Sequence, residues 1–223
     1  PPMSARRQRQ MCIRDSGVTR RSLERLGVGY ESPRRSQDYF TIPERDGSGN
    51  VVGISTRFTN GVKRAIPGST RGLVYADDWM RREGPVFIVE GASDTAALDS
   101  MGLAVIGTYT AGGGAEQLAK VLRNVPDDRM IIVIGENDWK IHDSLSDSIR
   151  VSHRAECTGC SKCWPGKCGA IKLAKALSLL LCREVGWCLA PDGKKDARAW
   201  VRFIRGECSC CLLYTSPSPR DDR

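Results

Sequence analysis

Short, mostly apolar runs recur from residue 85 onward, and this spacing is what most restricts the fold of the chain. Four runs of about the length of one β-strand lie at residues 85–91, 103–109, 129–138 and 183–191. Helix-length segments follow them, at residues 93–102, 112–125, 169–182 and 195–203. Because strands that are apolar throughout must be covered on both faces, the alternation predicts an α/β fold with a parallel sheet flanked by helices.

The first third of the chain has a different pattern. Residues 17–28 predict a short helix that ends in a glycine turn, and residues 39–58 predict two strands around the polar turn RDGSGN. Residues 61–75 are basic and glycine-rich, which indicates a strand followed by a loop. We therefore divide the chain into a small β-rich α+β segment at residues 17–83 and an α/β domain at residues 84–206.

The two ends of the chain resemble translated sequencing adapter. Residues 6–16 read RRQRQMCIRDS, and residues 211–221 read CLLYTSPSPRD. One transposase-adapter oligonucleotide encodes MCIRD, and its reverse complement encodes CLLYT. We therefore expect residues 1–16 and most of residues 207–223 to be adapter-derived, and the natural part to be a fragment of a longer chain. A pair of natural disordered tails is the alternative.

Composition is that of an ordinary globular protein, with 40% hydrophobic and 27% charged residues. The net charge of +8 favours a polyanionic partner, but residues 6–16 supply +3 of it, so the natural part carries +5. The apolar runs are far too short to span a membrane, and no signal peptide is visible. The sequence therefore predicts a cytoplasmic protein with no membrane partner.

Acidic residues stand at the ends of two predicted strands. Glu90 ends the strand VFIVE and Asp94 follows it, while Glu136 and Asp138 follow the strand MIIVIG. Because the carboxyl ends of parallel strands meet at one edge of a sheet, the four side chains converge if these strands are neighbours. Carboxylates this close repel one another, and a hard cation such as Mg²⁺ or Mn²⁺ offsets the repulsion. The pattern predicts a metal site, with Glu136 and Asp138 on the same side of the chain.

Each of these residues also has a simpler explanation. Glu90 can be an ordinary charge at a strand end, and Asp94 can cap the following helix, where the helix dipole stabilises a carboxylate. The matched positions of the two acidic pairs favour the metal site. Nearby, TAGGGAEQL (110–118) is either a phosphate-binding loop or, as we favour, a tight turn, because it lacks the Lys-Ser/Thr pair of a P-loop.

The E-G-x-x-D motif that begins at Glu90, followed by an acidic-x-Asp motif after a later strand, resembles the Toprim domain of bacterial-type primases, topoisomerases and OLD-type nucleases. The resemblance covers about residues 84–204, and VEGASDTAALDSMGLAVIG carries most of it. It implies a Rossmann-like sheet, catalytic roles for Glu90 and Asp94, and Mg²⁺ held by Glu90, Glu136 and Asp138. The family usually has Asp-x-Asp, so Glu136 is a longer carboxylate side chain than the Asp expected at this position.

Two further stretches resemble primases of phages and plasmids. NVVGISTRFTNGVKRAIPGSTRGLVY (50–75) is similar to the segment before Toprim in these primases and primase-helicases, and LAPDGKKDARAWV (189–201) is similar to their Gly-x-Asp element. The resemblance implies that Asp196 lies near the same site, and that Asp196 and Lys140 bind nucleotide or nucleic acid. A solvated loop lysine is the alternative for Lys140. WPGKCGA (164–170) is similar to a motif of phage-like Toprim proteins.

Ten cysteines are many for a cytosolic chain. An insertion at residues 139–168 contains four of them with C-x₂-C-x₂-C-x₄-C spacing, at Cys157, Cys160, Cys163 and Cys168. Four thiolates suit tetrahedral Zn²⁺, and a bound zinc ion would order this long polar loop. An iron–sulfur cluster and free thiols are the alternatives. Cys182 and Cys188 are predicted to pack in the core.

Together these features predict a fragment of a Mg²⁺-dependent DNA primase that makes RNA primers from NTPs on single-stranded DNA. A replicative helicase, on the same chain or a separate one, is a further expected partner. A Toprim nuclease or topoisomerase fragment is the first alternative, although no catalytic-tyrosine or ATPase domain is visible. A Toprim module that binds nucleic acid or nucleotide without turnover is the second, and the Glu136 departure keeps it open.

Overall fold

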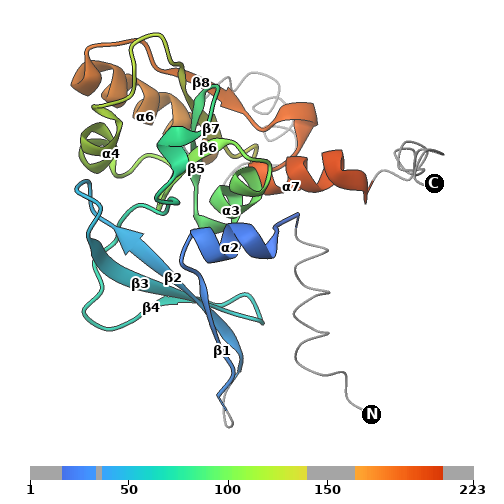
Figure 1. Cartoon of the computed structure of the whole chain (residues 1–223). Coiled ribbons are helices and arrows are strands. Elements are labelled where there is room, and N and C mark those ends of the chain that lie inside the picture. Colours follow the sequence, from blue (N-terminus) through green and yellow to red (C-terminus); the bar gives the residue numbers. More distant parts are fainter. Residues whose placement is uncertain (1–16, 34–36, 140–163, 208–223) are drawn as a thin grey trace, which may run out of the picture.

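The computed structural model describes residues 17–33, 37–139 and 164–207, and two four-stranded sheets form the framework of this part (Figure 1). The antiparallel sheet has the order β1-β2-β3-β4, at Gly29–Glu31, Tyr39–Arg45, Val51–Phe58 and Lys63–Ala65. The parallel sheet has the order β6-β5-β7-β8, with β5 at Val86–Glu90, β6 at Ala104–Thr108, β7 at Ile131–Gly135 and β8 at Gly186–Leu189. The predicted α/β fold with a parallel sheet is confirmed.

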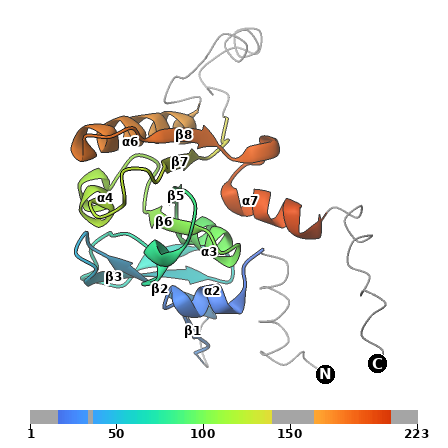
Figure 2. The same cartoon turned by 45° about the horizontal axis from the view of Figure 1, so that its top comes forward.

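Helices cover both faces of the parallel sheet. They are α2 at Arg20–Arg25, α3 at Ala92–Ser100, α4 at Ala115–Leu122, α6 at Pro165–Leu181 and α7 at Ala197–Arg202. In Figure 2, α4 and α6 lie on one side of the sheet and α3 and α7 on the other. None of the described helices is long and apolar enough to cross a membrane.

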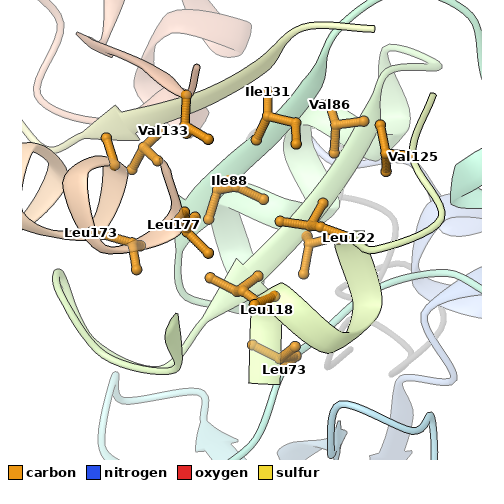
Figure 3. Close-up of a cluster of buried hydrophobic side chains, with 14 of the residues drawn as sticks. Leu73, Val86, Ile88, Leu118, Leu122, Val125, Ile131, Val133, Leu173 and Leu177 are labelled. Atoms are coloured by element: carbon orange, nitrogen blue, oxygen red, sulfur yellow. The ribbon is translucent and has the colours of Figure 1, made fainter. Parts of the chain in front are cut away.

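Alternate residues of each parallel strand enter opposite layers of the core, as the two-residue period of a strand requires. From β5, Ile88 faces α4 and α6, where it joins Leu118 and Leu177 (Figure 3). Its neighbour Val89 faces the other way and joins Leu98 of α3 in the second layer. Both layers are buried, which explains why the strands read as continuous apolar runs.

Two local predictions need correction. The helix expected from Gly169 begins four residues earlier, because Pro165 occupies its first turn, where a missing backbone N–H costs nothing. The end of the predicted cysteine-rich insertion, including Cys168, therefore belongs to α6. Cys182 is not a core residue: it is exposed and ends α6 in a left-handed conformation with φ of 52°. Cys188 is half-buried against the layer that contains α3.

A short extended segment joins the two sheets. Leu73 exchanges two backbone hydrogen bonds with Arg45 of β2, both of 2.7 Å, and the next residue, Val74, exchanges two with Gly107 of β6, of 2.9 and 2.8 Å. A Cβ on Gly72 would lie 2.5 Å from the carbonyl oxygen of Arg45, so only glycine permits this approach. The pairing holds the antiparallel sheet against the edge of the parallel sheet.

A buried carboxylate fastens the N-terminal helix to the α/β domain. Asp99 of α3 is almost inaccessible and lies 2.5 Å from the guanidinium of Arg25 and 3.0 Å from that of Arg82. Ser22 of α2 adds a hydrogen bond of 2.8 Å to the carbonyl oxygen of Ala96. Since α2 has six residues and is too short to be stable alone, these contacts hold it in place.

Asp99→Ala is expected to lower the free energy of unfolding by about 3 kcal/mol, because it leaves the partly buried guanidinium of Arg25 without a counter-ion and that of Arg82 with only Asp78, 3.6 Å away. Urea denaturation followed by circular dichroism measures the change. Asp127→Ala is the matched control: Asp127 is fully exposed and 3.8 Å from Arg183, so its loss should cost no more than about 0.5 kcal/mol. Equal effects of the two substitutions would contradict the role of Asp99.

Candidate active site

The strand order brings the predicted acidic residues to one edge of the sheet. β5 and β7 are neighbours, with Ile88 opposite Val133, so Glu90 at the end of β5 and Glu136 just past β7 face the same region. Burial, and then the charges of Glu136 and Asp138, raise the pKa of Glu90. Burial also raises the pKa of Glu136, and nearby acidic groups add to the shift. Of the four acidic residues expected together, Glu90, Asp94 and Glu136 line one cleft, whereas Asp138 does not line it.

Asp94 is the most deeply placed of these groups. Burial, followed by the charges of Asp196 and Glu136, raises its pKa from 3.8 to about 7, while Arg198 opposes the rise with its charge and its backbone N–H. Asp94 does not cap α3, because the N-cap position belongs to Gly91 with φ of 81°. Asp94 nevertheless lies in the first turn of α3, so its expected place near the positive end of the helix dipole is confirmed, and it also lines the cleft described below.

Asp138 and Asp196 each hold the start of a helix. The carboxylate of Asp138 accepts the backbone N–H of Gly166 in the first turn of α6, at 2.9 Å. Asp196 is the N-cap of α7 and accepts the N–H of Ala199 at 2.7 Å. Asp196 also lines the same cleft as Glu90, Asp94 and Glu136, as the primase resemblance implied.

A cleft of about 560 Å³ lies between the two sheets, and Glu90, Asp94, Glu136 and Asp196 line it. These four acidic residues come from the parallel-sheet side, and the antiparallel sheet supplies the opposite wall through β2, β3 and β4, which includes the acidic Glu44 of β2. Six basic residues line the cleft: Arg57, Lys63, Arg64, Arg71, Lys195 and Arg198. The cleft therefore combines a carboxylate cluster with a basic wall.

The basic wall is the part of the site that the sequence reading missed. Burial, and then the charge of Arg198, lowers the pKa of Arg57, while Asp94 opposes the shift. Lys63 lies near enough to the acidic groups to hold down the pKa of both Glu90 and Glu136. The period of β3 places Arg57 on the same face as Ser55, and both line the cleft, but the sequence alone does not show which face of the sheet meets the site.

The glycine-rich stretch at residues 110–118 is a tight turn, as favoured. Gly114, with φ of 81°, is the N-cap of α4, and the turn before it packs against the first turns of α6. Its backbone also takes part in the site, because the N–H of Ala111 donates to the carboxylate of Glu90.

Some predicted ligands cannot be placed. Lys140, Cys157, Cys160 and Cys163 lie outside the described residues, so the zinc or iron–sulfur prediction and the triphosphate contact stay predictions. Within the described ranges, no three His, Cys, Asp or Glu side chains are close enough together to hold a metal ion. The chemistry of the carboxylate pair Glu90 and Glu136 nevertheless suits a hard cation, because both are oxygen donors whose charged forms are penalised by burial and repulsion.

Solved structures of DNA primase catalytic cores share this arrangement of sheets and helices. A DNA primase domain from Pseudomonas aeruginosa aligns with TM-score 0.59 and 15% identity over 96% of this chain and 73% of that chain. The E. coli primase catalytic core aligns with TM-score 0.58 and 13% identity, over 90% and 70%. A DnaG primase catalytic domain bound to single-stranded DNA aligns with TM-score 0.58 and 14% identity, over 95% and 74%.

The chain has the fold of a DNA primase catalytic core. No protein-family model matches the sequence, and no curated protein matches it. Since the identities to these primase cores are 13–15%, the likeness extends to the fold, and the roles of individual residues must be argued from the cleft itself.

Asp94→Asn is expected to stabilise the protein at pH 8, because it removes a charge that burial and neighbouring carboxylates penalise. A raised pKa means that this penalty is absent below about pH 4 and grows as the pH rises to about 7. The difference in unfolding free energy between variant and parent should therefore increase from near zero at pH 4 to about 2–4 kcal/mol at pH 8, without divalent metal. Urea denaturation at several pH values measures it.

Asp77→Asn is the control, because the Asp77 side chain is largely exposed and should show no such increase. A stability difference for Asp94→Asn that is the same at pH 4 and pH 8 would show that the carboxylate is ionised without penalty.

Proposed function

We propose that this chain is the catalytic core of a Mg²⁺-dependent DNA primase of the Toprim type, which makes RNA primers from NTPs on single-stranded DNA. The observation that carries the proposal is the cleft, in which half-buried carboxylates face a basic wall. Primer synthesis needs both: cations for the phosphates of template and NTP, and a site that stabilises charge at the reacting groups. The primase-core fold supports the same function.

Glu90, Glu136 and Asp138 are the residues that would hold Mg²⁺ or Mn²⁺. Their carboxylates are the oxygen ligands that these ions prefer, and a cation would relieve the repulsion that raises the pKa of Glu90 and Glu136. When bound, the metal would activate the primer 3′ hydroxyl and stabilise the departing pyrophosphate.

The protein's own residues supply binding and proton transfer in this proposal. Arg57 and Lys63 bind phosphate oxygens across the cleft from the carboxylates, and Arg198 of α7 does so beside Asp94. Glu90, where it does not ligate the metal, accepts the proton of the 3′ hydroxyl, and its raised pKa suits a general base. Asp196 orders the first turn of α7, which carries Arg198.

Four further expectations belong to the same proposal. Lys140 would contact the triphosphate, and the four cysteines of the insertion would hold a structural zinc ion. A replicative helicase would work with the primase, as in the primase-helicases of phages and plasmids that the sequence resembles. The protein would act on DNA in the cytoplasm of a bacterial or phage-infected cell.

A second candidate function is a module that binds nucleic acid or nucleotide without turnover. One observation favours it: in the part of the chain that the structure describes, the acidic groups do not already enclose a metal position. The two functions differ in outcome, because the module would bind single-stranded DNA through the basic wall but make no primer.

Glu90→Gln and Asp138→Asn are expected to reduce primer synthesis by at least about 100-fold, because each removes a carboxylate from the reacting centre. Denaturing gels of labelled products from single-stranded template, NTPs and Mg²⁺ measure the rate. Glu184→Gln is the matched control, since Glu184 is exposed and precedes β8 at the opposite edge of the sheet. Undiminished synthesis by both site variants would exclude the catalytic role of the carboxylates.

Substituting both Arg57 and Lys63 by Ala is expected to weaken binding of single-stranded DNA about 10-fold at low salt. Loss of two phosphate contacts should also reduce the slope of log K against log salt by about 1.4. Fluorescence anisotropy with a labelled oligonucleotide at several salt concentrations measures both. Arg123→Ala removes an exposed charge just past α4, at the other end of that helix from the cleft, and should change neither. An unchanged slope in the double variant would remove the basic wall from the binding site.

A further inference from the structure

The first turn of α6 forms the floor behind the catalytic carboxylates. A narrow pocket of about 10 Å³ is lined by Glu90 and Glu136 on one side and by Gly166 and Ala170 of α6 on the other. This is room for one water molecule at most, so the helix packs directly behind the site. Side chains at the start of α6 would have to share this narrow space with the groups that hold the carboxylates.

Gly169 makes the closest approach. A Cβ at this position would overlap the carbonyl oxygen of Ala111 and lie 2.6 Å from its Cβ, so the turn after β6 would have to move to accommodate any side chain. Ala111 is the residue whose backbone N–H donates to Glu90. Movement of this turn would therefore move the backbone N–H of Ala111 relative to the Glu90 carboxylate.

Gly166, one helical turn earlier on the same face of α6, makes the equivalent approach to the end of β7. A Cβ there would lie 2.8 Å from both the Cβ of Glu136 and Oδ1 of Asp138. The N–H of Gly166 is also the donor to Asp138, at 2.9 Å. Gly166 thus contacts the segment that carries Glu136 and Asp138, and Gly169 contacts the turn whose backbone N–H donates to Glu90.

We propose that Gly166 and Gly169 are positioning residues for the active site. They let α6 approach so closely that backbone N–H groups hold two carboxylates, Asp138 directly and Glu90 through Ala111. Glycine in a helix is less favourable than alanine by roughly 0.5–1 kcal/mol, so two glycines in successive turns cost stability unless close approach is needed. Only the catalytic consequence of this inference rests on the proposed primase function.

The amide proton resonance of Ala111 tests the link directly. In ¹H–¹⁵N spectra of the metal-free protein, Glu90→Gln should move this resonance upfield, because an amide oxygen is a weaker acceptor than a carboxylate. Gly169→Ala should shift the same resonance and largely abolish the further effect of Glu90→Gln. Gly112→Ala is the matched control on the opposite side of the same contact: its Cβ would have ordinary spacing, 3.6 Å from the Cα of Gly169, and the Glu90→Gln effect should persist.

Two outcomes would overturn the inference. One is an Ala111 resonance that Glu90→Gln leaves unchanged in the otherwise unaltered chain, a result that needs no glycine variant to fold. The other is a Glu90→Gln effect of full size in the Gly169→Ala background.

Primer synthesis provides a second, independent readout. Gly169→Ala should lower kcat by about 10- to 100-fold with little change in KM for NTP, since misplacement by about 1 Å affects the reacting centre more than binding. Gly112→Ala should match the parent. If the parent makes no primers, the proposed function fails while the spectra still test the positioning role. If the parent is active but kcat of Gly169→Ala is unchanged, the positioning role fails and the proposed function stands.

Discussion

Repulsion between carboxylates at one edge of the parallel sheet is the constraint around which the site is arranged. Burial and like charge raise the pKa of Glu90, Asp94 and Glu136, so the fold must offset a cost that grows with pH. Backbone N–H groups offset part of this cost. Glu90 accepts an N–H from the turn before α4, and Asp94 accepts one from the start of α7. Asp138 accepts one from the start of α6. These donors are held by packing, so they add no mobile charge to the cleft.

The second offset comes from the antiparallel sheet, which a pair of backbone contacts joins to β6. The paired segment at Leu73 and Val74 places β3 and β4 opposite the carboxylates. Arg57 and Lys63 then lie close enough to influence the acidic groups electrostatically. A polyanion that enters between the walls replaces repulsion among the cations with attraction, which is why the cleft suits nucleic acid and nucleotide together.

Local sequence patterns predicted the elements better than the contacts between them. Continuous apolar runs identified every strand of the parallel sheet, and glycine and polar turns separated the hairpin strands β2 and β3. The start of α6 was placed late because Pro165 was taken for loop, although the first turn of a helix tolerates proline. The helix pattern placed Asp94 in the first turn of α3, but helix position alone does not reveal that its side chain lies within electrostatic reach of Arg198 and Asp196.

The sequence by itself determined that carboxylates end two apolar strands, because strand period and strand ends are properties of neighbouring residues. Only the tertiary structure decided that β5 and β7 are neighbours and that β3 brings Arg57 to the cleft. It also decided that Gly169 packs against Ala111, in the turn next to Glu90. Each of these contacts joins residues far apart in the chain. Their formation depends on which faces bury together and how closely backbones can approach, and no local pattern encodes that choice.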